Sequence, residues 1–292
     1  MFPKDSKDRV ESPNHAIGVY VMTHGPTCTH HPGDYCIPFE IGAAFRDNCK
    51  YTMRDNMGEN HISEKDKLYC ELTGLYWMWK NDMHDYVGLY HYRRTFNITS
   101  NKIHRWLSKY DWIVPLYTNT TPYTVESLYC ESHVREDWVI LKDVLKELYP
   151  EYYKSSEVFF SGHSMYHCNM FVTTKKNFDR YCEWLFPLLE AIEARIDLND
   201  GRSEYNKRAI GFMAERLFSL YLYHNRYKLK EVMIYPVAPY HPLVSILPPK
   251  LLKFIESKPS IYQGLLYTQH RVYYSLLKLF PVATRNIRKK IE

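Results

Sequence analysis

Hydrophobic positions in this chain of 292 residues switch repeatedly between a period of two and a helical period of about 3.6. Short apolar runs rich in β-branched and aromatic residues predict strands at 16–22, 86–90, 111–115 and within 161–172. Longer segments with apolar residues three or four apart predict helices at 63–80, 136–149, 177–196 and 203–224. Strands and helices therefore mix along the chain, as in an α/β protein.

The most informative stretch runs from a predicted helix into a predicted strand. Ser63 is placed to cap the helix and Asp66 to close a capping box, and the strand ends in the segment from His91 to Arg94. Open α/β sheets bind ligands outside the carboxyl ends of their strands. Because arginine matches phosphate oxygens with a planar fork of donors and histidine adds a hydrogen bond, we expect a phosphate site here. Ion pairs at the surface or between domains are the alternative role of the arginines.

The four side chains of this segment are expected to divide between two faces. If the strand period continues, His91 and Arg93 project from one face, and Tyr92 and Arg94 from the other. We therefore expect at most two of the four to reach one ligand.

Further candidate contacts are polar residues beside the predicted elements. His24 follows the first strand, where α/β folds often bind a nucleotide, and an ordinary turn histidine is the alternative. Asp55 and Asn60 lie in a polar loop and are candidates for binding sugar hydroxyls, with a solvated loop as the alternative. Asn169 precedes an apolar run, and its amide offers both a donor and an acceptor to a sugar hydroxyl.

The last predicted helix carries a candidate general base. Its buried side is defined by apolar residues such as Ile210 and Leu217, while Arg208 and Glu215 point the opposite way with Phe212 between them. A carboxylate in a cleft beside arginines is suited to accept a proton, whereas an exposed helical glutamate is the alternative.

Charge is concentrated at one end of the chain. Residues 250–292 contain nine basic and two acidic residues, a net charge of +7, whereas the remaining 249 residues have a net charge of −2. A main domain without a positive field is not typical of a nucleic-acid-binding protein. The basic segment alternates with apolar residues, which favours binding to an anionic membrane surface, or else a helix packed on the main domain.

The compartment is indicated by what the sequence lacks. Seven scattered cysteines contain no C-x-x-C pair, so we expect reduced thiols. No run approaches the roughly 18 apolar residues of a membrane span, and the amino terminus is polar. We therefore expect a cytoplasmic protein, with peripheral binding to the inner face of the membrane through 250–292.

Five ordered segments together resemble one protein family. They are Ser63 to Asn81, Tyr86 to Arg94, Asn169-Met-Phe, Tyr181 to Pro187 and Gly211 to Leu217. The family comprises bacterial capsular and exopolysaccharide biosynthesis proteins, long catalogued as a domain of unknown function and now grouped with glycosyltransferases. The resemblance covers about residues 17–240 and is specific as a set.

The resemblance implies a single α/β domain of the glycosyltransferase A-type fold, with a mixed, mostly parallel sheet flanked by helices. We expect this domain at 16–247, after a polar lead-in at 1–15 and before a basic amphipathic helical tail at 248–292. The implied donor is a nucleotide sugar, with UDP-galactofuranose as the leading candidate, and the acceptor a glycan or a lipid-linked glycan. A-type enzymes usually hold a divalent metal with Asp-x-Asp. Because this sequence has no such motif, we expect no metal cofactor.

An inverting displacement is the mechanism that the motif set implies. In it Glu215 takes the acceptor proton, while His91 and Arg93 stabilise the departing diphosphate. The expected donor-binding residues are His24, Asp55, Asn60, Tyr92, Arg94 and Asn169. Glu64 is the alternative base, and the alternative ion-pair partners of Glu215 are Arg208 and Arg216.

Two other classes of protein fit the same residues. A non-catalytic polysaccharide-binding or scaffold protein of the same pathway would use the aromatic residues, which make up 16% of the chain, but would not bind a nucleoside diphosphate. A sugar-phosphate transferase would also use the arginines but would release UMP in place of UDP.

Overall fold

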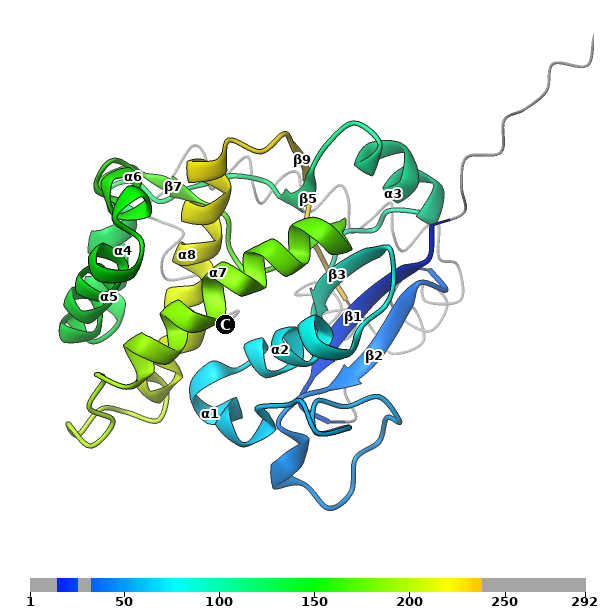
Figure 1. The fold of residues 1–292 in the computed structure, drawn as a ribbon, viewed down its shortest axis with the longest axis horizontal. Coiled ribbons are helices and arrows are strands. Elements are labelled where there is room, and N and C mark those ends of the chain that lie inside the picture. Colours follow the sequence, from blue (N-terminus) through cyan, green and yellow to red (C-terminus); the bar gives the residue numbers. More distant parts are fainter. Residues whose placement is uncertain (1–14, 26–32, 238–292) are drawn as a thin grey trace, which may run out of the picture.

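A mixed sheet forms the centre of the computed structural model, which describes residues 15–25 and 33–237 (Figure 1). In spatial order its main strands are β2 (Cys36–Glu40), β1 (Ile17–Thr23), β3 (Tyr86–His91), β8 (Phe171–Thr174), β5 (Trp112–Pro115) and β9 (Leu229–Val232). Two short strands, β4 (Arg94–Thr95) and β10 (Tyr235–Pro236), extend the sheet beside the end of β3. Most of the predicted lead-in and the whole predicted tail at 248–292 lie outside the described residues.

Parallel pairing dominates the sheet. β1 runs parallel to β2 and β3, and β5 runs parallel to β9, whereas β8 is antiparallel to both β3 and β5. The parallel ladders contain more of the paired residues than the antiparallel ladders. The predicted fold class, a mixed and mostly parallel sheet flanked by helices, is therefore confirmed.

Strand β3 is buried on both faces, because successive side chains point to opposite sides of the sheet. Val87 and Leu89 pack in the larger apolar cluster, and Tyr86 and Tyr90 pack in the smaller one. Between them, a Cβ atom at Gly88 would lie 2.7 Å from the carbonyl oxygen of Phe171. Glycine at this position therefore allows β8 to approach β3.

Helices cover both faces of the sheet. The larger cluster includes residues of α2 (Leu72–Asn81), α4 (Val125–Ser132), α5 (Arg135–Leu148), α6 (Pro150–Phe160), α7 (Lys175–Glu193) and α8 (Ala209–Asn225). In Figure 1, α2 and α7 cross in front of the sheet, while α4, α5 and α6 lie beyond α8. The smaller cluster includes α3 (Ser100–Leu107) on the other face. The remaining elements are η1 (Ala43–Phe45), η2 (Ser63–Lys65), α1 (Asp66–Tyr69), β6 (Thr118–Asn119), β7 (Ser164–Met165) and η3 (Asn206–Arg208).

The helix predicted at 63–80 is interrupted in the structure. Cys70 has φ 54° and ψ −130°, so the chain leaves the helical conformation between α1 and α2. The predicted cap is also wrong, because the Ser63 hydroxyl donates to Asp55 Oδ1 at 2.6 Å and accepts from the Ala44 N–H at 3.0 Å. By contrast, the predicted helices at 136–149 and 177–196 agree closely with α5 and α7.

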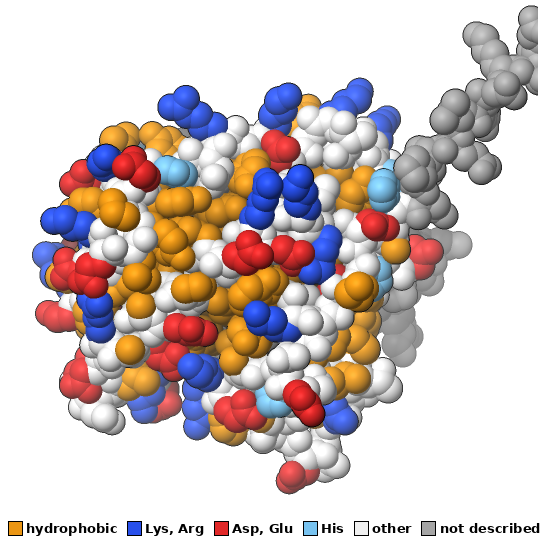
Figure 2. Space-filling model, viewed as in Figure 1, with side chains coloured by type: hydrophobic (Ala, Val, Ile, Leu, Met, Phe, Trp, Pro, Cys, Tyr) orange, Lys and Arg blue, Asp and Glu red, His pale blue; other side chains and the backbone are white. Residues whose placement is uncertain are grey.

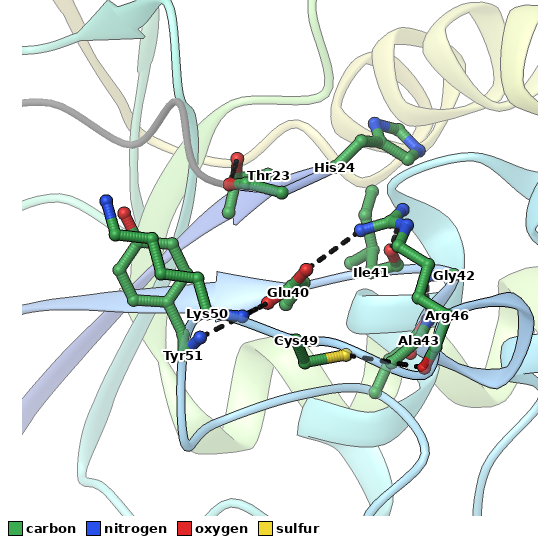
Figure 3. Close-up of polar contacts among 12 residues, drawn as sticks. Thr23, His24, Glu40, Ile41, Gly42, Ala43, Arg46, Cys49, Lys50 and Tyr51 are labelled. Atoms are coloured by element: carbon green, nitrogen blue, oxygen red, sulfur yellow. Dashed lines mark hydrogen bonds and ion pairs between the residues drawn. The ribbon is translucent and has the colours of Figure 1, made fainter.

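The loop after β2 is fixed by a buried carboxylate (Figure 3). Glu40 has no exposed surface and accepts hydrogen bonds from Arg46 Nη1 at 3.0 Å, Lys50 N at 2.9 Å and Tyr51 N at 3.2 Å. An unpaired buried charge would be costly, and these three donors compensate it. The loop is thereby held against the end of the sheet, next to Ile41.

The surface carries both signs of charge around apolar side chains. On the face seen in Figure 2, apolar side chains gather over the region of α7 and α8, with acidic and basic side chains interspersed around them. Within the described ranges, no helix has the length and apolar character needed to cross a bilayer.

Candidate active site

A cavity of about 230 Å³ lies at the carboxyl ends of β1 and β3. Its lining residues are Met22, His24, Ile41, Cys70, Glu71, His91, Tyr92, Arg93, Arg94, Cys168, Arg208, Gly211, Phe212 and Glu215. The sequence-predicted residues that the structure brings together here are His24, His91, Tyr92, Arg93, Arg94, Arg208 and Glu215. The cavity thus joins the end of β3 to one side of α8, two elements far apart in sequence.

A tight hairpin places the whole segment from His91 to Arg94 on this cavity. His91 ends β3 and pairs with Arg94 of β4, so Tyr92 and Arg93 form the two-residue turn between them. Contacts from distant segments hold this turn, since Tyr92 N donates to Met22 O at 3.1 Å and Val237 N donates to Arg93 O at 2.9 Å. The expectation that at most two of the four side chains reach one site is therefore wrong, because the extended period ends at His91.

The backbone of Cys168 holds two candidate residues at once. Its carbonyl oxygen lies 2.8 Å from His91 Nε2, and its N–H donates to Glu215 Oε1 at 3.0 Å. Since a carbonyl oxygen can only accept, Nε2 of His91 carries the proton. Cys168 itself has φ 78°, a conformation that non-glycine residues seldom adopt.

His91 is a neutral imidazole at neutral pH. Burial, followed by the charge of Arg94, lowers the pKa of His91 to about 4, although the hydrogen bond to Cys168 acts in the opposite direction. His91 therefore contributes no positive charge to the site. Its position instead fixes the Cys168 peptide.

Glu215 is a partly buried carboxylate with an ion-pair partner. Its side chain is 22% exposed, and Oε2 accepts from Arg216 Nη1 at 3.2 Å. Burial raises the pKa of Glu215, Arg216 opposes this shift, and the nearby charge of Glu71 adds to it. A glutamate with a raised pKa in a cavity is suited to general-base chemistry.

The two candidate partners of Glu215 have different positions. Arg216 makes the ion pair and does not line the cavity, whereas Arg208 lines the cavity and donates from Nε to Cys70 Sγ at 3.0 Å. Arg208 also lies 5.4 Å from the ring centre of Phe212, one turn along the helix. The cavity wall formed by the start of α8 is therefore cationic and aromatic.

His24 lies at the edge of the cavity and is 45% exposed. Its Nε2 atom is 3.1 Å from Asp66 Oδ1 at the start of α1. This contact orients the imidazole beside the end of β1, where the sequence predicts a nucleotide contact.

Besides Arg216 and Asn169, three predicted residues do not line the cavity. Asp55 has no exposed surface, so it is not accessible to a sugar; its carboxylate accepts from Gly42 N, Ala43 N, Ser63 Oγ and Thr73 Oγ1. Asn60 is exposed, and its carbonyl accepts from the Asn81 amide at 3.2 Å. Glu64, the alternative base, is 62% exposed and lies 3.5 Å from His61.

Glu71 is a cavity residue that sequence reasoning missed. It is 8% exposed, and its Oε1 accepts from the Asn169 amide at 3.0 Å. One signal was present, because Glu71 falls between Leu68 and Leu75 at the spacing of the apolar stripe, where a charge is unexpected. Asn169 itself does not line the cavity but supports Glu71 from behind.

No group of three or more His, Cys, Asp or Glu side chains within 15–25 and 33–237 is arranged to hold a metal ion. The charged groups of the cavity are three guanidinium groups, which donate hydrogen bonds, and the carboxylates of Glu71 and Glu215, which accept them. This set is suited to a ligand that carries its own negative charge.

The mixed sheet and its flanking helices match part of a solved glycosyltransferase structure. The chain is similar to the apo structure of WbbM, a bifunctional glycosyltransferase, with 29% sequence identity and a TM-score of 0.70. The match covers 77% of this chain and 46% of that structure, so this chain spans less than half of its length.

The family assignment comes from the sequence match. Residues 18–226 match a family described as a domain of unknown function, DUF4422, and the chain belongs to this family. None of the curated proteins matches the chain. The family match and the similarity to WbbM together support the predicted glycosyltransferase-like family.

Proposed function

We propose that this protein is a glycosyltransferase that moves a sugar from a nucleoside-diphosphate donor to a glycan or lipid-linked acceptor. The leading donor is UDP-galactofuranose, and the expected pathway is capsular or exopolysaccharide synthesis. The observation that carries the proposal is that Arg93 and Arg94, in the hairpin after β3, line the same cavity as Glu215 of α8. The similarity to a bifunctional glycosyltransferase supports it.

The arginines are suited to bind the diphosphate. Arg93 and Arg94 line the cavity from the hairpin, and Arg208 lines it from the start of α8. Guanidinium groups donate two parallel hydrogen bonds to phosphate oxygens and remain charged at all physiological pH values. Fixed positive groups stabilise the charge that develops on the leaving diphosphate. We therefore propose that the leaving group is stabilised without a metal ion.

Glu215 is the proposed general base of an inverting displacement. The acceptor hydroxyl oxygen forms a bond to the anomeric carbon, its proton goes to Glu215, and the bond between the anomeric carbon and the phosphate oxygen breaks with its electron pair on the nucleoside diphosphate. Hydrogen bonds from Cys168 N and Arg216 Nη1 hold the carboxylate in position. Positioned proton transfer of this kind accelerates reactions by roughly 100- to 10,000-fold.

An acceptor path runs along one side of α8 and η3. Glu215, Phe212 and Arg208 line the cavity at helical spacing, and Tyr205 continues the same side toward solvent. Tyr205 is 54% exposed, and its ring lies 4.9 Å from that of Phe212, centre to centre. Because the apolar faces of sugar rings pack on aromatic rings, we propose that the acceptor glycan enters over Tyr205.

A direct assay separates this proposal from its rivals. The protein is incubated with a panel of UDP-, GDP- and dTDP-sugars and a capsular glycan acceptor, and the products are identified by mass spectrometry. Transfer of a sugar with release of UDP is expected. Glycan binding with no transfer from any donor would instead indicate the scaffold class, and release of UMP would indicate a sugar-phosphate transferase.

A further inference from the structure

The cavity contains a second carboxylate, and its position needs an explanation. Glu71 lines the cavity wall, is 8% exposed and stands at the break between α1 and α2. Burying a charge is costly unless the group is paired or serves a ligand. The one hydrogen bond to its side chain that the described residues show comes from the neutral Asn169 amide, at 3.0 Å.

Strained backbone lies at both ends of this hydrogen bond. Cys70, next to Glu71, has φ 54°, while Cys168 and Asn169 have φ 78° and φ 48°. Non-glycine residues seldom adopt such a conformation, and it persists where the surrounding structure enforces it, often at a ligand site. The interaction between Asn169 and Glu71 joins the two strained segments across the wall of the cavity.

Asn169 is suited to position Glu71. Its side chain is 4% exposed, and the amide nitrogen donates to Oε1 of Glu71. The amide oxygen is buried without a hydrogen-bond partner. Asn169 thus makes its side-chain hydrogen bond to the carboxylate and is held behind it, away from the cavity surface.

The charges of the cavity divide into two kinds. The arginines of the hairpin and Arg208 attract an anion, whereas Glu71 repels one. An ionised carboxylate only accepts hydrogen bonds, so its natural ligand is a donor such as a hydroxyl group. The cavity therefore matches a ligand with an anionic part and a neutral part rich in hydroxyls.

We propose that Glu71 binds a hydroxyl group of the donor sugar and so selects the sugar, and that Asn169 is the positioning residue that holds its carboxylate. This inference rests on the proposed function, because a sugar must be present beside the diphosphate. Glu71 contributes to choosing among nucleotide sugars, while the arginines bind the part that all of them share.

The test compares donors that each lack one sugar hydroxyl. In the wild-type protein, loss of the hydroxyl that Glu71 binds lowers kcat/KM by roughly 10- to 100-fold, the value of a hydrogen bond to a charged group. In Glu71→Ala the same donor loses little further activity, while the penalties for the other missing hydroxyls persist. In Glu71→Gln, whose neutral amide oxygen still accepts a hydrogen bond, the penalty for this hydroxyl is reduced. Asn169→Ala reduces the penalty for the same missing hydroxyl. In the double variant Glu71→Ala/Asn169→Ala this penalty equals that in Glu71→Ala alone.

Two controls make the outcome decisive. Glu157→Ala removes an exposed carboxylate of α6 that lies outside the cavity, and it leaves the preference among donors unchanged. Titration calorimetry with UDP shows that the Glu71 variants are folded and keep their affinity for the nucleotide. Glu71→Gln, nearly equal in shape, replaces Glu71→Ala where the smaller side chain prevents folding.

The results separate this inference from the proposed function. If the wild-type protein turns over no nucleotide sugar, the proposed function and this inference both fail. If the wild-type protein is active and every hydroxyl penalty is the same in the Glu71 variants, only the role of Glu71 as a sugar-selecting residue is overturned. A uniform loss of rate with all donors also overturns it.

Discussion

The backbone N–H of Cys168 donates a hydrogen bond of 3.0 Å to Glu215 Oε1. The carbonyl of the same residue accepts a hydrogen bond from His91, so β3 and α8 are fixed to each other through the backbone of one residue. Arg216 engages the other oxygen of Glu215 at 3.2 Å. The carboxylate is thus held by two donors beside the arginine turn, the geometry that the proposed general base requires.

Glu215→Gln is expected to lower kcat by roughly 100- to 10,000-fold, because the amide cannot accept the acceptor proton. UDP affinity should remain unchanged, since Glu215 does not bind the diphosphate in the proposed mechanism. Steady-state kinetics and calorimetry with UDP measure the two quantities. Near-normal transfer by this variant would exclude Glu215 as the base.

The same residue predicts a pH dependence. Burial raises the pKa of Glu215, and a base must be deprotonated to act. We therefore expect kcat/KM to rise with pH, with an apparent pKa above the ordinary pKa of glutamate. Measuring kcat/KM in wild type and Glu215→Gln over about pH 4 to 9 tests this. This rise of kcat/KM with pH should disappear in the variant. If it persists, it reports the titration of another group.

Arg93→Ala is expected to weaken UDP binding by on the order of 10- to 100-fold, because a charge-assisted hydrogen bond to the diphosphate is lost. Arg93→Lys restores part of the affinity, since lysine keeps the charge but not the planar fork. EDTA should leave wild-type affinity unchanged. Titration calorimetry with UDP measures the affinity of both variants and of the wild type with and without EDTA.

The control for this prediction is Arg105→Ala, which removes an exposed arginine of α3 away from the cavity. It should bind UDP as the wild type does. Equal losses in both variants would point to long-range electrostatics, and a loss of UDP binding in EDTA would show that a metal ion takes part.

Local periodicity predicted much of the fold, but it could not predict the tertiary contacts around the site. Short apolar runs predicted β1, β3 and β5, and helical spacing placed Glu215 on the same side as Arg208, the residue just before α8. The turn at Tyr92 and Arg93 contains no glycine or asparagine that would predict it, and backbone hydrogen bonds to residues distant in sequence hold it. The break at Cys70 is likewise not predictable from local sequence, because only the folded structure enforces a positive φ there.

His91→Gln is expected to reduce the loss of stability in acid. The pKa of His91 is about 4 in the folded protein and about 6.5 in an unfolded chain, so between these values the unfolded state binds more protons. Wild-type stability therefore falls as pH decreases from about 6.5 to about 4, and glutamine does not titrate.

Urea denaturation at several pH values measures this effect as the difference in unfolding free energy between wild type and His91→Gln. The difference should be constant above about pH 7 and should shift in favour of the variant by on the order of 3 kcal/mol near pH 4. Burial also lowers the pKa of His133 to about 4, but this group is present in both proteins and cancels. A difference independent of pH would contradict a neutral His91.

Removing charge from the carboxyl-terminal segment is expected to weaken binding to anionic vesicles. Each basic residue near such a surface contributes about 1 kcal/mol, so replacing Arg288, Lys289 and Lys290 by glutamine should lower the partition coefficient by roughly 100-fold. Sedimentation with phosphatidylglycerol vesicles measures it, and neutral phosphatidylcholine vesicles should not bind.

The matched control removes three exposed positive charges at and just after α3, by replacing Lys102, Arg105 and Lys109 with glutamine. This variant should keep most of its vesicle binding. Equal weakening in both triple variants would reflect net charge alone, and absence of binding by the wild type would overturn the proposed membrane contact.

Tyr205→Ala is expected to raise the KM for the glycan acceptor by roughly 2- to 10-fold, because aromatic stacking contributes about 0.5–1.5 kcal/mol. Tyr205→Phe keeps the ring and should behave like the wild type, and the KM for the donor should not change in either variant. Tyr223→Ala is the matched control, since Tyr223 is 47% exposed near the carboxyl end of α8 and does not line the cavity. An equal effect of both alanine variants on acceptor KM would show that the acceptor does not enter over Tyr205, whereas an effect confined to Tyr205 would place the acceptor along the side of α8 that leads to Glu215.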